Sequence, residues 1–210
     1  STSCLRGSDM SDAKEHEVLA KLRKAMQRDG FDALVALSID NVTYTAGFLV
    51  PSHVSNRFRR TITILAGTGF ARQIVVNVEE NLAKASSRIS DIVAYNQFTE
   101  NPADVLADAL IEAGVATGRI GLELDFMPAI DYIRLVERLP KAKFEGCKDL
   151  YFNTRMIKTD AELATLRKVG ELTDRIIGEV IRDIRPGVTE KEVGKNIVDS
   201  TYDPAIISGW

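Results

Sequence analysis

The stretch RMIKTDAEL at residues 155–163, with RPGVTE at residues 185–190, divides this sequence into two parts. Thr159 and Glu162 have the spacing of a capping box. In such a box the threonine hydroxyl accepts from the glutamate N–H, and the glutamate carboxylate accepts from the threonine N–H. The stretch therefore predicts a helix that begins directly after Thr159. We expect one α/β domain before this point and the beginning of a second domain after it.

The second part of the sequence predicts two helices followed by an extended run. Apolar residues recur at helical spacing after the first capping box, and Pro186-Gly187 ends this periodicity. A second capping box, formed by Thr189 and Glu192, starts another helix that reaches about residue 199. The inward residues expected on the first helix are Leu163, Leu166, Val169, Leu172, Ile176, Ile177, Val180 and Ile181.

The first part of the sequence alternates between predicted strands and helices. Short apolar runs bounded by turn residues predict strands, and longer segments with a 3.6-residue period predict helices. Gly67-Thr68-Gly69 is followed by a strand and not by a helix, so we interpret it as a hairpin turn rather than a phosphate-binding loop. This order predicts a three-layer α/β domain with a mixed sheet. The expected strands are residues 31–38, 61–66, 73–78, 91–95, 119–124 and 142–147, and the expected helices begin at residues 13, 79, 102 and 128.

Two local expectations concern the end of this domain. The helix that begins at Pro128 is expected to place Ile130, Ile133, Leu135 and Val136 inward. Residues 149–158 contain neither glycine nor proline, and we expect them to be a connecting segment.

Composition excludes several classes of protein. The chain has 210 residues, 45% of them hydrophobic, and a formal net charge of −3. A basic excess is therefore missing, and we expect no nucleic-acid partner. No apolar run is long enough to cross a bilayer and no signal peptide is visible, so we expect a cytoplasmic protein without membrane contact. Cys4 and Cys147 are too few for a disulfide framework, which fits a reducing compartment, and Cys147 is interpreted as a small core residue.

A basic loop at residues 51–60 (PSHVSNRFRR) is the candidate binding segment. His53, Arg57, Arg59 and Arg60 occur there without a single acid. Arginines on a loop tethered by two strands can hold a carboxylate, because the guanidinium offers paired donors. The alternative is a solvated loop or one that contacts a second subunit. His16 and His53 lie too far apart in the sequence to form a local metal or triad motif.

Several motifs together resemble one family. Asn41-Val-x-Tyr44-x-x-Gly47-Phe48, Arg119-Ile-Gly-Leu-Glu123 and Arg155-x-Ile157-Lys158-Thr159-x-x-Glu162 occur in that order, before Pro186-Gly187-x-Thr189-Glu190. A first helix and strand, at residues 22–34, precede them. This set is similar to the domain junction and N-terminal domain of the creatinase / prolidase / aminopeptidase P family.

The resemblance implies both an architecture and an activity. The implied domains are a tail at residues 1–12, a creatinase/prolidase N-terminal-like domain at 13–152, and the beginning of an α+β pita-bread catalytic domain at 153–210. The implied activity is that of a homodimeric, metal-dependent Xaa-Pro dipeptidase or aminopeptidase acting on a peptide. Two divalent metal ions (Mn, Co or Zn) are implied for the intact enzyme, where they generate and hold the attacking hydroxide. The alternatives are a creatinase-type hydrolase of small amides that needs no metal, and a non-catalytic binding module of the same fold.

The resemblance also implies substrate-binding residues, but it identifies no catalytic residue in this sequence. A Phe-x-Arg pattern before a strand in creatinase is similar to Phe58-Arg59-Arg60, and we carry a substrate-binding role to Phe58 and Arg60. With His53 and Arg57 of the same loop, these are the expected substrate-binding residues. No metal ligand and no catalytic residue of the family can be assigned in this sequence. The interval between Thr189-Glu190 and Ser208-Gly209 is shorter than the resemblance implies, and two alternatives stay open near Ser200-Thr201: a continuous chain, or one from which residues are missing. We expect the 210 residues alone not to be a competent hydrolase.

Overall fold

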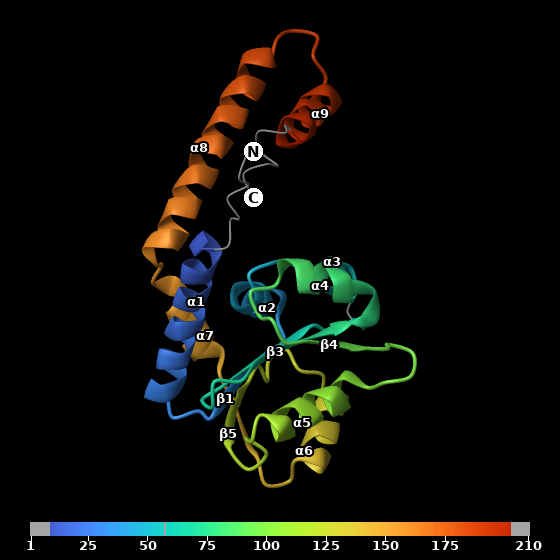
Figure 1. Ribbon diagram of the computed structural model, residues 1–210. Helices are drawn as coiled ribbons and strands as arrows, with labels where there is room; N and C mark the ends of the chain where they lie inside the picture. Colours follow the sequence, from blue (N-terminus) through green and yellow to red (C-terminus); the bar gives the residue numbers. More distant parts are fainter. Residues whose placement is uncertain (1–8, 57, 203–210) are drawn as a thin grey trace, which may run out of the picture. The chain divides into compact units, whose positions relative to one another are not determined.

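The computed structural model describes residues 9–56 and 58–202 (Figure 1). The chain divides into two compact units, one ending at Ile157 and the other starting at Lys158. The first unit is built on a six-stranded sheet in the order β4-β3-β2-β1-β5-β6. The strands are β1 (Ala33–Ala36), β2 (Ile62–Ala66), β3 (Ala71–Val76), β4 (Ile92–Tyr95), β5 (Arg119–Leu122) and β6 (Lys143–Gly146).

The sheet is mixed, as the sequence predicts. Strand β2 pairs antiparallel with both β1 and β3, whereas β3–β4, β1–β5 and β5–β6 are parallel pairs. The turn at Gly67-Thr68-Gly69 joins β2 to β3, which confirms the hairpin. Gly69 takes a φ of 96°, a conformation that glycine adopts without the strain of a side chain.

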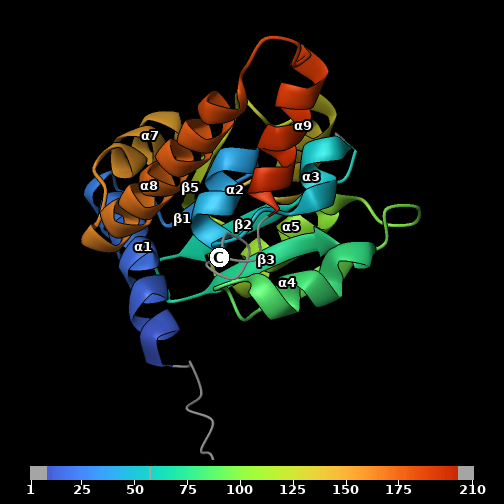
Figure 2. The ribbon, with the colours of Figure 1, turned by 90° about the horizontal axis from the view of Figure 1, so that it is seen from above.

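Helices cover both faces of the sheet in the first unit. Figure 1 shows α5 and α6 below the sheet and α2, α3 and α4 above it, and Figure 2 views the upper layer from above. The helices of this unit are α1 (Asp9–Arg28), α2 (Ile39–Ala46), α3 (Pro51–Ser55), α4 (Glu80–Ser86), α5 (Pro102–Glu112), α6 (Ala129–Arg138) and α7 (Lys148–Met156), with a short 3-10 turn, η1, at Asn77–Glu79.

Strand β1 shows how the alternating pattern makes two cores. Ala33 and Val35 pack in the cluster that contains the inner faces of α5 and α6. Leu34 and Ala36 pack in the other cluster, with residues of α1, α2 and α7. Because successive side chains of a strand point to opposite faces, a continuous apolar run such as this one suits a strand buried on both sides.

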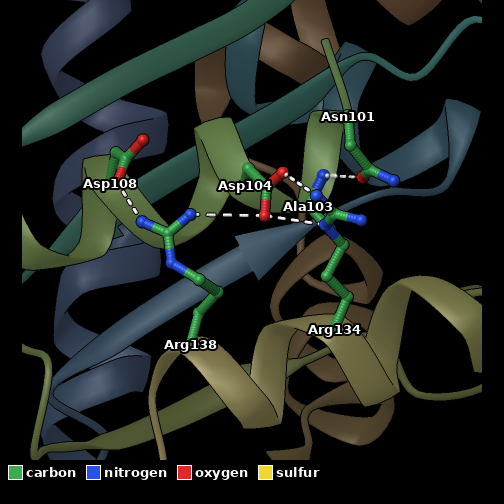
Figure 3. Close-up of polar contacts among 6 residues, drawn as sticks. All are labelled: Asn101, Ala103, Asp104, Asp108, Arg134 and Arg138. Carbon is green, nitrogen blue, oxygen red and sulfur yellow. Dashed lines mark hydrogen bonds and ion pairs between the residues drawn. The ribbon is translucent and has the colours of Figure 1, made fainter.

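An ion-pair cluster joins α5 to α6 on the surface (Figure 3). Arg134 donates to both oxygens of Asp104, at 2.8 and 2.5 Å. Arg138 pairs with Asp104 at 3.2 Å and also with Asp108. The hydrogen bond from Arg134 is the main reason that the pKa of Asp104 lies below its ordinary value. We call these four residues the surface cluster.

The second unit contains α8 (Asp160–Asp183) and α9 (Glu190–Thr201), which pack on each other. Both capping boxes are present at their first turns. Thr159 donates its N–H to Glu162 at 2.8 Å and accepts the Glu162 N–H at 3.2 Å. Thr189 and Glu192 repeat the arrangement, which confirms both predicted helix starts. Of the expected inward residues of α8, Val180 is buried, whereas Leu166, Ile177 and Ile181 are exposed.

The prediction that residues 149–158 form a connecting segment is wrong, because most of these residues form helix α7. Leu150, Tyr151 and Thr154 are buried, and they supply the packing that the short segment needs. Helix α7 packs against α1 and belongs to the first unit, which ends at Ile157. Helix α1 begins at Asp9 and not at the expected residue 13.

The inward face predicted for α6 is also wrong. Only Leu135 is buried, whereas Ile130, Ile133 and Val136 are exposed. Tyr132 takes the inward position instead and packs edge-on against Phe144 of β6, with 6.2 Å between ring centroids. In a short helix the apolar periodicity is compatible with burial of either of two adjacent faces. The contact between Tyr132 and Phe144 decides which face of α6 is buried.

Candidate functional site: the loop at residues 51–60 and its polar support

The loop at residues 51–60 follows α2 and leads into β2. Its first half is the short helix α3, which begins at Pro51. The backbone N–H of Ser52 donates to the carboxylate of Glu79 at 3.0 Å, and this bond fixes the start of α3 against the segment after β3. This bond holds the beginning of the loop, and β2 holds its end. The expectation of a strand on both sides is wrong, because helix α2 precedes the loop.

His53 lies half-buried on α3, beside the end of β1. Its ring hydrogen-bonds to the Leu37 carbonyl, and it lies close enough to Arg60 and Glu123 for their charges to act on it. Burial lowers the pKa of His53 from its ordinary value, and the positive charge of Arg60 lowers it further. The ring is therefore neutral near pH 7, and it can donate one hydrogen bond and accept another.

Arg60 is fixed by Tyr95, a residue that is almost fully buried at the end of β4. The Arg60 N–H donates to the Tyr95 hydroxyl at 2.8 Å, and that hydroxyl donates back to the Arg60 carbonyl at 3.1 Å. Burial raises the pKa of Tyr95, so this hydroxyl stays protonated and keeps its donor. The Arg60 guanidinium lies 3.6 Å from the carboxylate of Asp131, within a small hollow lined by residues at the starts of β2, α5 and α6.

The other predicted residues of the loop are not gathered with these two. Phe58 is 71% exposed and lines a separate open hollow with Phe98 and Arg134. Arg59 donates to the side-chain oxygen of Gln97 at 3.0 Å. Arg57 lies outside the described residues. The structure therefore brings His53 and Arg60 together and leaves Phe58 facing outward.

Glu123 organises the polar groups beneath the loop, and sequence reasoning did not single it out as a site residue. It is 4% exposed. Its carboxylate accepts the N–H groups of Leu37 at 2.5 Å and Ser38 at 2.8 Å, and the side-chain amide of Asn41 at 2.6 Å. Glu123 follows β5, whose Leu122 lies opposite Val35 of β1. Parallel strands end at the same edge, so this register places Glu123 beside the unpaired N–H groups where β1 stops.

Asn41 and Arg155 continue this arrangement to the end of α7. Arg155 donates to the side-chain oxygen of Asn41 at 3.0 Å and lies 3.9 Å from Asp40. The same guanidinium lies over the ring of Tyr44, 5.9 Å from its centroid. We call Glu123, Asn41 and Arg155 the junction relay, because they connect the end of β1 to the segment where the first unit ends.

The sequence contains the residues of the relay, but only within separate motifs. Its members belong to three of the motifs that carry the family resemblance, one around Asn41, one ending in Glu123 and one beginning at Arg155. An acid that directly follows an apolar strand is the clue to Glu123, since the end of a neighbouring parallel strand offers free N–H groups. Sequence spacing alone gives no reason to join residues that lie so far apart in the chain.

No metal site is found in the part of the chain that the structure describes. Among those residues no three His, Cys, Asp or Glu side chains form a group that could hold a metal ion. The metal ligands that the resemblance implies therefore remain unassigned among the described residues. Cys147 is 2% exposed and packs with α1 and α7, which confirms it as a core residue. Burial also raises the pKa of its thiol.

Comparison with known proteins identifies the family. Residues 19–157 match the creatinase/prolidase N-terminal domain. The chain belongs to the creatinase/prolidase family. It is 27% identical over 174 residues to a creatinase from Bacillus sp. (strain B-0618), covering 82% of this chain and 41% of that protein. It is 25% identical over 202 residues to an Xaa-Pro dipeptidase from Lactobacillus delbrueckii subsp. lactis, covering 91% of this chain and 54% of that protein.

Solved structures support the same fold. An Xaa-Pro dipeptidase from Bacillus anthracis superposes with a TM-score of 0.66 at 22% identity, covering 89% of this chain and 48% of that one. This agrees with the predicted fold class, an α/β domain of creatinase/prolidase type. The chain spans about half the length of the relatives it matches. None of the helices in the described ranges is long and apolar enough to cross a membrane.

Proposed function

We propose that the whole protein is an Xaa-Pro dipeptidase or aminopeptidase, and that the loop at residues 51–60 contacts its substrate. The observation that carries this proposal is the match to the Xaa-Pro dipeptidase of Lactobacillus delbrueckii along 91% of this chain. The activity itself is assigned to the whole protein, because this chain covers 54% of that relative. Two divalent metal ions supply the attacking hydroxide in such an enzyme.

Arg60 is the residue proposed to hold a substrate carboxylate. Tyr95 bonds to both the N–H and the carbonyl of Arg60, so the backbone that carries this side chain is held before a substrate arrives. Its present ion pair with Asp131, at 3.6 Å, is longer than a direct charged hydrogen bond. A substrate carboxylate that docks in bidentate fashion can replace this weak partner. His53 is neutral and gives its N–H to the Leu37 carbonyl, so its other ring nitrogen can accept a hydrogen bond from a donor group of the substrate.

The test is hydrolysis of Ala-Pro and Gly-Pro by the whole protein, with Mn²⁺ or Co²⁺ and again with a chelator. The proposal expects turnover that the chelator abolishes. Arg60→Ala should raise KM about tenfold or more, because a charged hydrogen bond is worth about 1.5–3 kcal/mol. Arg59→Ala is the matched control, since Arg59 bonds to Gln97 instead. An unchanged KM in Arg60→Ala contradicts the assignment of the loop.

A creatinase-type activity is the second candidate, favoured by the 27% identity to the creatinase of Bacillus sp.. Creatine also carries a carboxylate, so Arg60 serves equally in this case. Hydrolysis of creatine that persists with the chelator, without turnover of Xaa-Pro dipeptides, would select it. A protein that hydrolyses neither substrate would instead support a binding module of the same fold.

We also propose that the whole protein is a homodimer, as the family resemblance implies. Sedimentation equilibrium over a range of concentrations measures this directly. A molar mass of one subunit at micromolar concentration would contradict it.

A further inference from the structure

We propose that the junction relay of Glu123, Asn41 and Arg155 holds the last turn of α7 at the end of the first unit, and that Arg155 is a positioning residue for the whole protein. The relay begins at a buried place, where β1 ends and the chain turns into α2. It ends at the last turn of α7, two residues before the first unit stops at Ile157. No member of the relay belongs to the loop proposed to contact substrate.

The side-chain amide of Asn41 connects the two charged residues of the relay. Its nitrogen donates to Glu123 at 2.6 Å, and its oxygen accepts from Arg155 at 3.0 Å. The amide therefore stands between a carboxylate and a guanidinium, with each end turned to the group of opposite charge. Asn41 is 7% exposed and Glu123 is 4% exposed, so the contact between these two residues lies in surroundings of low polarity. Hydrogen bonds that polarise one another are strengthened in such surroundings.

Other contacts hold the same end of α7. Lys21 of α1 donates to the carbonyl of Ile157, directly after the last turn. Lys21 also donates to the hydroxyl of Tyr44 at 3.1 Å, and its ammonium lies 5.8 Å from the ring centroid. Two cations thus approach Tyr44, one from α1 and one from α7. A cation at the carboxyl end of a helix is favoured by the helix dipole and by the unpaired carbonyls.

The relay also shares its base with the proposed substrate loop. Glu123 holds the N–H of Leu37, and His53 bonds to the carbonyl of that same residue. Leu37 is therefore held from one side by the relay and from the other by the loop. A shift of α7 that pulls on Asn41 acts on the backbone to which His53 is attached. This gives a physical path between the exit of the chain and the loop.

Hydrogen exchange of the 210-residue chain tests the relay without any activity. Arg155→Ala should make the amides of residues 154–157, and those of Leu37 and Ser38, exchange about tenfold faster, because a charged hydrogen bond that closes the local structure is lost. Arg138→Ala is the matched control. Arg138 and Arg155 have similarly exposed side chains, 37% and 38%, but Arg138 belongs to the surface cluster.

The outcomes are distinct. Unchanged exchange at residues 154–157 in Arg155→Ala would overturn the proposal, and so would an equal change there in Arg138→Ala. If Arg155→Ala does not fold, Arg155→Lys carries the same test. Lysine keeps the charge near Tyr44 but loses the planar donor geometry, so the acceleration should lie between that of the alanine variant and none. Exchange in Arg155→Lys that equals the wild type would also contradict the role of the guanidinium.

The positioning role is read from kinetics of the whole protein, and this part rests on the proposed hydrolase activity. Arg155→Ala should lower kcat about tenfold or more while KM changes less than about twofold, and Arg155→Lys should restore part of kcat. A wild-type protein without hydrolase activity would refute the proposed function but leave the exchange result standing. An active enzyme whose kcat is unaffected by Arg155→Ala would refute the positioning role alone.

Discussion

The junction relay and the surface cluster of α5 and α6 are built from the same kinds of side chain but differ in what surrounds them. Arg155 and Arg138 have almost equally exposed side chains, 38% and 37%. The relay leads inward to Glu123, which is 4% exposed, whereas the side chains of Asp104 and Asp108 are 25% and 57% exposed. The exposure of an arginine therefore does not reveal its energetic role. The burial of the groups at the other end of its hydrogen bonds decides it.

The difference also lies in what each assembly joins. The surface cluster links two helices that already share the apolar core beside the sheet. The relay links the end of β1 to the last turn of α7, and no strand pairing connects these two places. Loss of the cluster leaves α5 and α6 packed, whereas loss of the relay removes polar contacts on which the end of α7 depends.

Glu123→Ala should give the largest loss, about 3–5 kcal/mol in the free energy of unfolding, because it leaves buried donors without an acceptor. The measurement is urea unfolding followed by near-UV circular dichroism, which reports on Tyr95 and Tyr151, both buried in the first unit. Glu112→Ala is the control, since Glu112 pairs with Arg72 while its side chain is 58% exposed. A loss for Glu123→Ala no larger than that of the control would refute the central role of Glu123.

Asn41→Leu should destabilise the first unit by about 2–3 kcal/mol, since it leaves an oxygen of Glu123 and the guanidinium of Arg155 without their shared amide. The same unfolding measurement applies. Asn101→Ala is the control, because Asn101 caps α5 through the N–H of Ala103 at 2.8 Å, and loss of a cap costs about 1 kcal/mol. If the two variants lose equal stability, Asn41 acts only as the local residue of a helix start.

Arg138→Ala should reduce stability by no more than about 1 kcal/mol, and added salt should shrink the effect, because exposed ion pairs are screened. Urea unfolding at low and high salt measures both quantities. Asn41→Leu should show little dependence on salt. A larger loss in Arg138→Ala than in Asn41→Leu would reverse the comparison.

His53→Gln should give the smallest effect, visible as a change in pH dependence. The pKa of His53 in the folded chain lies below its ordinary value of 6.5, so the unfolded chain binds the proton first. The stability associated with the neutral ring is complete above about pH 6.5, and it is lost as the pH falls from there through the folded pKa. His53→Gln should flatten this step in urea midpoints taken between about pH 5 and pH 8. A step of equal size in the variant would assign it to another group.

The sequence predicts the strands, the hairpin and both capping boxes because each depends on neighbours in the chain. Thr159 and Glu162, for example, satisfy each other within one helical turn. The sequence does not predict α7, because local periodicity gives no sign of this short helix. Burial of Tyr151 against distant parts of the fold stabilises it. The choice of the inward face of α6 depends in the same way on Phe144.

The candidate site also has one part that the sequence predicts and another part that depends on distant partners. The basic loop is visible in the sequence as a run of arginines, but their separate partners are not. Arg59 bonds to Gln97 and Arg60 lies near Asp131, and each partner comes from a different later segment. Glu123 meets Asn41 only because β1 and β5 are neighbours in a parallel pair. That adjacency is set by the order of the whole sheet and not by any local pattern.

Two double-mutant cycles measure the coupling within the junction relay and within the surface cluster. The free energy of unfolding is measured for Asn41→Ala, Arg155→Ala and their combination, and likewise for Asp108→Ala, Arg138→Ala and their combination. The relay predicts a coupling of about 1.5 kcal/mol or more between Asn41 and Arg155, and the surface cluster predicts less than about 0.5 kcal/mol between Asp108 and Arg138. Equal couplings in the two cycles, or additivity of Asn41→Ala and Arg155→Ala, would contradict the account.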